Sequence, residues 1–281
     1  MRMRHGLACL FLLSAMPIAH AQDAPKPAPD NSIVVTGKEQ KPIKKAERFI
    51  GQVLDVNDGQ LARFVDPVCP LVTGLKPQFN EMIAERFRAV ASATSVRFAK
   101  AKCQPNLMIV FANDGDALLQ SMRKQHNAVF DNLDDGALQD AFKSGPVHAW
   151  RLVVSRDEVG HISTANDDPD NPPVMEGDIQ ATTINAVVVI DRKAAQGKSV
   201  KQIADYAAMR TLVGAKAPEK GSIKAASILS LFDPAVAPPP TEISDMDLGL
   251  LAGLYKMRDP SEPGSDQAWR IAHAMTSGKQ R

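Results

Sequence analysis

The stretch TTINAVVVID, residues 182–191, decides the fold class of this chain. Apart from Asn185, residues 184–190 are apolar at every position, so the two faces of a strand formed here do not alternate between apolar and polar. Such a strand belongs in the middle of a sheet that is covered on both sides. The sequence therefore predicts an α+β or α/β fold in which helices flank a mixed sheet.

Apolar periodicity places the neighbouring elements around this strand. Strands are predicted at 107–112, 147–154 and 183–191, and helices at 78–93, 115–127, 200–213 and 245–257. We expect one globular domain over residues 44–257, with residue 145 as the point at which two lobes would divide, and a C-terminal tail over 258–281.

The first 21 residues have the pattern of a secretory signal peptide. Arg2 and Arg4 form a basic head, residues 7–16 are apolar, and Ala19, His20 and Ala21 form the cleavage site. We expect cleavage after Ala21 and a periplasmic or secreted product. No later apolar run reaches the roughly 20 residues that a membrane-spanning helix needs, so no transmembrane anchor is predicted.

A flexible leader is predicted over residues 22–43, because it is rich in proline and alanine and lacks apolar periodicity. It contains a short β-branched run that resembles the TonB box of outer-membrane receptors. This resemblance implies TonB contact by strand addition, and the alternative is an edge strand or tether of the chain's own domain. The run consists of Ile33, Val34, Val35, Thr36 and Gly37.

Charge and cysteine content exclude some classes of function. The 33 basic residues nearly balance the 32 acidic ones, so no nucleic acid partner is expected. Cys9 leaves with the signal peptide. Because an oxidising compartment favours pairing, the remaining Cys69 and Cys103 are predicted to form a disulfide.

The helix at 200–213 carries the candidate pocket residues Asp205, Tyr206 and Arg210. Ser199 and Gln202 have the spacing of a capping box, and Gly214 is predicted to end the helix. Asp205 and Arg210 lie about 140° apart around the helix, so they are not expected to pair. The alternatives are solvent-facing or capping roles, and for Tyr206 an aromatic pair with Tyr255.

The order of elements after residue 180 resembles the C-terminal half of an exported zincin-like family related to metalloproteases. The resemblance covers residues 180–257 and rests on Leu212 and Gly214, on the Ser227-Ile228 turn, and on a final helix within 241–255. The positions at which that family carries its zinc ligands and base hold Ala207, Ala208 and Thr211 here. The resemblance therefore implies a zincin-like scaffold that lacks the HExxH ligands.

Two further groups of polar residues are interpreted as structural and not as functional sites. His148, beside Trp150, is interpreted as a hydrogen-bonded strand histidine. The acidic loop with Asp167, Asp168, Asp170 and Asp178 lacks the spacing of a calcium loop and is interpreted as solvated surface.

The function expected from the sequence is that of a periplasmic, non-catalytic binding or accessory protein. No catalytic residue, metal or cofactor is predicted, and the partner would be a periplasmic protein or a small molecule. The alternatives are a peptidase-like hydrolase whose site the sequence does not reveal, and a tethered protein that contacts TonB.

Overall fold

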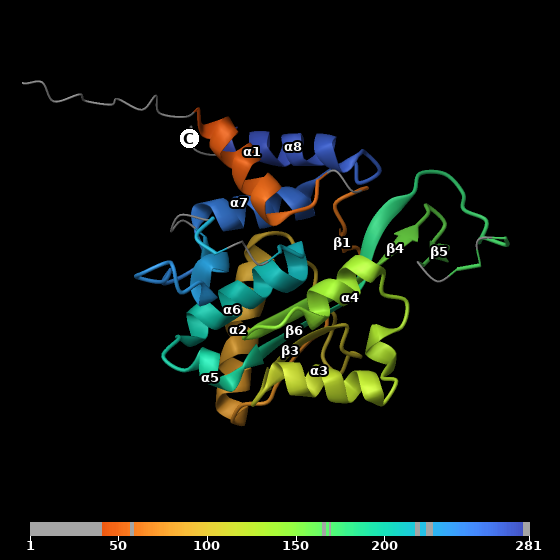
Figure 1. Cartoon of the computed structure of the whole chain (residues 1–281). Helices are drawn as coiled ribbons and strands as arrows, with labels where there is room; N and C mark the ends of the chain where they lie inside the picture. Colours follow the sequence, from red (N-terminus) through yellow and green to blue (C-terminus); the bar gives the residue numbers. More distant parts are fainter. Residues whose placement is uncertain are drawn as a thin grey trace, which may run out of the picture. The chain divides into compact units, whose positions relative to one another are not determined.

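A mixed sheet lies at the centre of the computed structural model (Figure 1). The structure describes residues 41–277, except for 57–58, 165–166, 169, 217–219 and 223–226. The predicted signal peptide and the TonB-box-like segment of residues 33–37 lie outside the described residues.

The sheet combines parallel and antiparallel strands, as predicted. Its strand order is β2-β3-β6-β4-β5, and β1 also pairs with β6. Strands β1, β2, β3 and β6 run parallel, whereas β4 is antiparallel to both β6 and β5. The bounds are Arg63–Phe64 for β1, Pro70–Thr73 for β2, Leu107–Ala112 for β3, Val147–Arg156 for β4, Ile162–Ser163 for β5 and Gln180–Asp191 for β6.

Strand β6 is central and buried on both faces, which confirms the interpretation of the stretch at 182–191. Val188 and Ile190 pack into a large core on one face, and Val187 and Val189 into a smaller core on the other. The division follows from the two-residue period of a strand.

Helices cover both faces of the sheet (Figure 1). On the face of the large core lie α1 (Pro42–Val53), α2 (Pro77–Ala93), α6 (Val200–Ala208), η2 (Met209–Val213), η3 (Ile228–Phe232), α7 (Asp245–Lys256) and α8 (Gly264–Ser277). On the other face lie α3 (Gly115–Lys124), η1 (Ala128–Phe130) and α4 (Asp135–Phe142), while the short α5 (Arg192–Ala195) follows β6. The segment η2 is one π-helical turn that continues α6.

The domain boundaries differ from those expected. Strands from before and after residue 145 pair with β6, so the described chain does not divide into lobes at this point. Residues 264–277, expected as tail, form α8, which packs against α1 and α7 and buries Ile271 and Ala272. At the other end, α1 begins at Pro42, inside the predicted leader. The globular domain therefore spans residues 42–277.

Cys69 and Cys103 form the predicted disulfide, with their Cα atoms 6.0 Å apart. It connects the residue before β2 to the loop that leads into β3. The backbone N–H of Cys69 also donates to Asn106 Oδ1 at 2.7 Å, so the same loop is held twice. Among the described residues, no helix has both the length and the apolar character needed to cross a bilayer.

Candidate functional site

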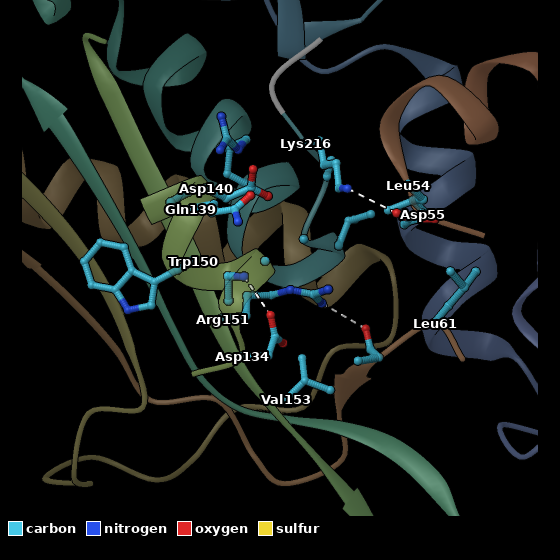
Figure 2. Close-up of a pocket in the computed structure, with 18 of the residues that line it drawn as sticks. Leu54, Asp55, Leu61, Asp134, Gln139, Asp140, Trp150, Arg151, Val153 and Lys216 are labelled. Carbon is cyan, nitrogen blue, oxygen red and sulfur yellow. Dashed lines mark hydrogen bonds and ion pairs between the residues drawn. The ribbon is translucent and has the colours of Figure 1, made fainter. Parts of the chain in front are cut away.

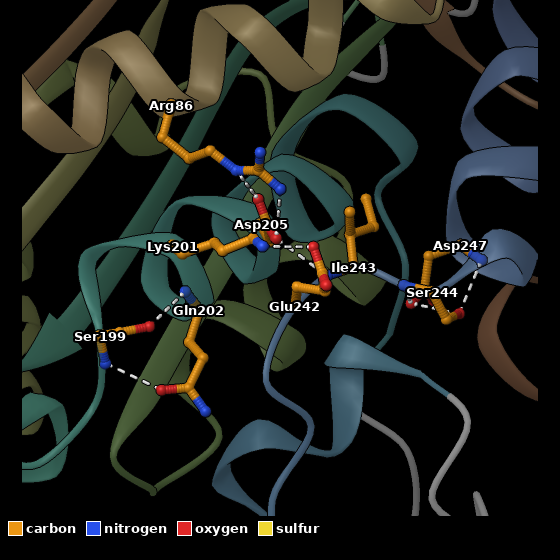
Figure 3. Close-up of polar contacts among 9 residues, drawn as sticks. All are labelled: Arg86, Ser199, Lys201, Gln202, Asp205, Glu242, Ile243, Ser244 and Asp247. Atoms are coloured by element: carbon orange, nitrogen blue, oxygen red, sulfur yellow. Dashed lines mark hydrogen bonds and ion pairs between the residues drawn. The ribbon is translucent and has the colours of Figure 1, made fainter.

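Asp205 is a buried residue that links three segments of the fold. Its side chain is fully buried and accepts hydrogen bonds from Nε and Nη2 of Arg86 at 2.7 and 2.9 Å (Figure 3). It also accepts from the backbone N–H of Ile243 at 2.8 Å. Asp205 therefore connects α6 to α2 and to the loop before α7, and it does not pair with Arg210.

The start of α6 is fixed as the sequence predicts. Ser199 Oγ accepts from the backbone N–H of Gln202 at 3.1 Å, and the Gln202 side chain accepts from the backbone N–H of Ser199 at 2.8 Å (Figure 3). This capping box fixes the residue at which α6 begins.

Tyr206 and Arg210 lie one helical turn apart and contact each other. Arg210 Nη1 donates to the Tyr206 hydroxyl at 2.8 Å, and the guanidinium lies 5.8 Å from the centre of the Tyr206 ring. The Tyr206 ring packs edge-on against Phe232, at 4.8 Å between centroids. The aromatic partner of Tyr206 is thus Phe232 and not Tyr255, which was the alternative considered for it; the Tyr255 hydroxyl donates to the Leu212 carbonyl at 3.1 Å.

The Arg210 guanidinium is buried without a negative partner. The residue is only 8% exposed, and no carboxylate among the described residues lies within ion-pair distance of it. Its Nε is buried and has no acceptor within the described chain. Because an isolated buried charge is costly, such a guanidinium is a strong candidate for binding an anion.

Arg210 lines a cavity of about 370 Å³. This cavity lies between β4, η2, α4 and the segment after α1 (Figure 2). The walls include the apolar side chains of Leu54, Leu61, Val153 and Val213. A second cavity of about 720 Å³ shares Arg210, Asp140 and Lys216 with the first. Arg210 therefore lies where the two cavities meet.

A second arginine that the sequence did not single out, Arg151 of β4, lines the first cavity (Figure 2). Its Nη1 donates to the Ala62 carbonyl at 3.0 Å and to Thr183 Oγ1 at 3.3 Å, which are both uncharged acceptors. Burial lowers the pKa of the Arg151 guanidinium, and nearby Tyr255 acts in the opposite direction. Its sequence signal is a lone charge within the apolar strand HAWRLVV, at 148–154.

Gly214 fixes the position of Arg151. It ends the π-helical turn with φ of +68°, a conformation that glycine adopts at little cost. A Cβ atom at this residue would lie 1.9 Å from Arg151 Cζ, so the guanidinium lies directly against the glycine backbone. Gly214 therefore both ends the helix, as predicted, and makes room for Arg151.

The acidic residues of the first cavity are exposed, in contrast to its two arginines. Asp134 caps α4 by accepting from the backbone N–H of Ala137 at 2.7 Å, and Asp55 pairs with Lys216 at 3.3 Å (Figure 2). Asp140 is exposed and has no ion pair among the described residues. The cavity thus combines an acidic rim with two inner guanidinium groups.

The positions that would carry zinc ligands in the zincin-like family lie in the protein core. Ala207, Ala208 and Thr211 are fully buried, and Thr211 Oγ1 donates to the Ala207 carbonyl at 2.7 Å. Within the described ranges, no group of three or more His, Cys, Asp or Glu side chains is arranged to hold a metal ion. His148 is a buried strand residue whose Nδ1 lies 3.0 Å from the Ala141 carbonyl oxygen.

Comparison with family models, with curated proteins and with solved structures finds no match for this chain. Its function must therefore be inferred from the geometry and chemistry of its own residues.

Proposed function

We propose that this protein is an exported, non-catalytic binding protein that takes a small organic anion, a carboxylate, at Arg210. The observation that carries the proposal is the buried guanidinium of Arg210, whose Nε has no acceptor within the described chain. Arginine binds carboxylates through two parallel hydrogen bonds, which are stronger than bonds between neutral groups.

The surroundings of Arg210 suit such a ligand. The Tyr206 hydroxyl accepts a hydrogen bond from Arg210, which leaves its own proton for a further acceptor. The apolar walls of the first cavity offer contact for the hydrocarbon part of the ligand. Small-molecule sites commonly combine apolar walls with a few polar groups, in volumes of roughly 300–1,000 Å³.

Isothermal titration of the mature protein with short straight-chain monocarboxylates tests this proposal. We expect saturable binding to the wild type, and a loss of about tenfold or more in affinity in Arg210→Met, since hydrogen bonds to charged groups contribute about 1.5–3 kcal/mol. Lys201→Met, which removes an exposed cation from the same helix, serves as the matched control. Its affinity should equal that of the wild type.

Two results would contradict the proposal. One is the failure of every carboxylate in the series to bind, or binding that Arg210→Met leaves intact. The other is hydrolysis of peptides or esters by the wild type that is lost in Arg210→Met, because this would place catalysis at the same site. Hydrolase activity elsewhere, and TonB contact through residues 33–37, stay predictions from the sequence.

A further inference from the structure

We infer that the ligand carries two anionic groups, one bound by Arg210 and the other by Arg151, so that the natural ligand class is a small dicarboxylate. This inference rests on the proposed function and specifies its ligand. The motivating feature is that two guanidinium groups line one cavity of about 370 Å³ without a carboxylate partner among the described residues.

Several other arginines of the described chain have partners that occupy their guanidinium groups. Three of them pair with a carboxylate, namely Arg86 with Asp205, Arg156 with Asp66 and Arg270 with Glu262. Arg63 has no such partner, but it donates to the Leu254 and Met257 carbonyls at the C-terminal end of α7, where the helix dipole favours a cation. Arg63 also shares a cavity, of about 450 Å³, with Arg97 and Arg258. Arg210 differs from these arginines because its Nε is buried without an acceptor in the described chain, and Arg151 lines the same cavity as Arg210.

Arg151 is held in place before any ligand binds. The Ala62 carbonyl and Thr183 hydroxyl accept from Nη1, and the backbone of Gly214 lies against the guanidinium. Neither Nε nor Nη2 donates to an acceptor among the described residues, and neither is among the buried unpaired atoms. A preorganised group loses little conformational freedom on binding, which favours affinity.

Charge at the rim is consistent with a dianion. Asp55 is paired with Lys216, and Asp134 is engaged at the N-terminus of α4. Asp140 is the remaining acid that lines the cavity, and it is exposed. An acidic rim disfavours anions that stay at the surface, whereas a ligand that reaches both inner arginines places each charge beside a guanidinium.

The experiment compares straight-chain dicarboxylates, from succinate to suberate, with monocarboxylates of the same chain length by isothermal titration of the mature protein. In the wild type, at least one diacid should bind about tenfold or more tightly than its monoacid, as expected for one added charge-assisted contact. In Arg151→Met this ratio of affinities should fall to about one.

Gly214→Ala tests the same idea without changing any charge, because the added Cβ displaces the Arg151 guanidinium. It too should reduce the ratio. Arg151→Lys keeps the charge but loses the planar guanidinium that binds a carboxylate through two hydrogen bonds, so it should give an intermediate ratio. It replaces Arg151→Met if circular dichroism shows Arg151→Met to be unfolded.

The outcomes separate this inference from the proposed function. Monoacids that bind through Arg210, with no diacid binding more tightly, would overturn the inference and leave the proposed function standing. A ratio that is unchanged in Arg151→Met would also overturn it. If no mono- or dicarboxylate binds the wild type, both fail together.

Discussion

The carboxylate of Asp205 accepts hydrogen bonds from both Nε and Nη2 of Arg86. The two residues lie on different helices, Asp205 on α6 and Arg86 on α2. Arg86→Met would leave the Asp205 carboxylate fully buried with the Ile243 backbone N–H as its remaining partner. Loss of one partner of a buried ion pair typically costs about 3–5 kcal/mol. Because the Arg86 side chain is 30% exposed, we expect a fall of about 3 kcal/mol in the free energy of unfolding, measured in urea.

A matched control lies on α6, the helix that carries Asp205. Lys201 pairs with Glu242, and both side chains are about half exposed (Figure 3). Lys201→Met should therefore cost less than about 1 kcal/mol. Equal losses in the two variants would show that burial does not set the strength of the Arg86–Asp205 pair.

Gly214→Ala should destabilise the protein more than Gly197→Ala. Both glycines have positive φ, +68° and +76°, so alanine is strained by about 1–2 kcal/mol at either position. At Gly197 nothing lies within 4 Å of the added Cβ, whereas at Gly214 it meets the Arg151 guanidinium. The difference between the two variants in urea unfolding measures this contact, and a difference of zero would mean that Arg151 moves aside at no cost.

Asp140→Asn should increase the affinity for a carboxylate. Asp140 lines both cavities together with Arg210, so its removal takes away a like charge close to the bound anion. Because Asp140 is exposed, solvent screens this repulsion, and we expect a gain of about two- to fivefold at low salt. Asp131→Asn, at an exposed position outside both cavities, is the control. Weaker binding in Asp140→Asn would mean that Asp140 contacts the ligand as an acceptor.

Asp157 directly follows β4, and we expect it to make the segment between β4 and β6 less stable in acid. Burial acts to raise the pKa of this carboxyl, but hydrogen bonds from the backbone N–H groups of Glu176 and His161, at 2.8 Å each, outweigh burial, and the pKa is lowered. A lowered pKa contributes stability above the unfolded value of about 4, and this contribution is lost as the pH falls through the folded pKa.

Hydrogen exchange of the segment between β4 and β6, followed from pH 7 to pH 2.5, would measure this effect after correction for the intrinsic pH dependence of exchange. We expect protection of the segment after Asp157 to decrease below about pH 4. Asp157→Asn should remove most of this pH dependence and reduce protection at neutral pH. Protection that is constant with pH in the wild type would contradict the assignment.

Local pattern was sufficient to predict much of the fold. β3 has the predicted bounds, because a run of six apolar residues is a signal within a few residues. β1 and β2 were not predicted, since strands of two and four residues carry too little pattern. α8 buries its apolar side against α1, more than 200 residues earlier in the sequence, so its own periodicity looks marginal.

The candidate site was predicted only in part. Periodicity placed Asp205 and Arg210 on one helix, but it could not show that α2 brings Arg86 onto Asp205. Nor could it show that the end of α6 leads to a glycine against Arg151, which lies on a distant strand. Two signals were present, an arginine within an apolar strand and a glycine beside the helix end, and only the fold relates them.

The packing of α1 against α8 has a consequence for how the protein is made. Synthesis proceeds from the N-terminus, so α1 emerges with Phe49 and Ile50 uncovered while the rest of the domain is still being translated. The partner surface, with Ile271 and Ala272, is among the last parts of the described domain to appear. Throughout elongation the nascent chain therefore presents the uncovered apolar face of an amphipathic helix, which holdase chaperones can bind, and the domain becomes complete only when its two ends meet.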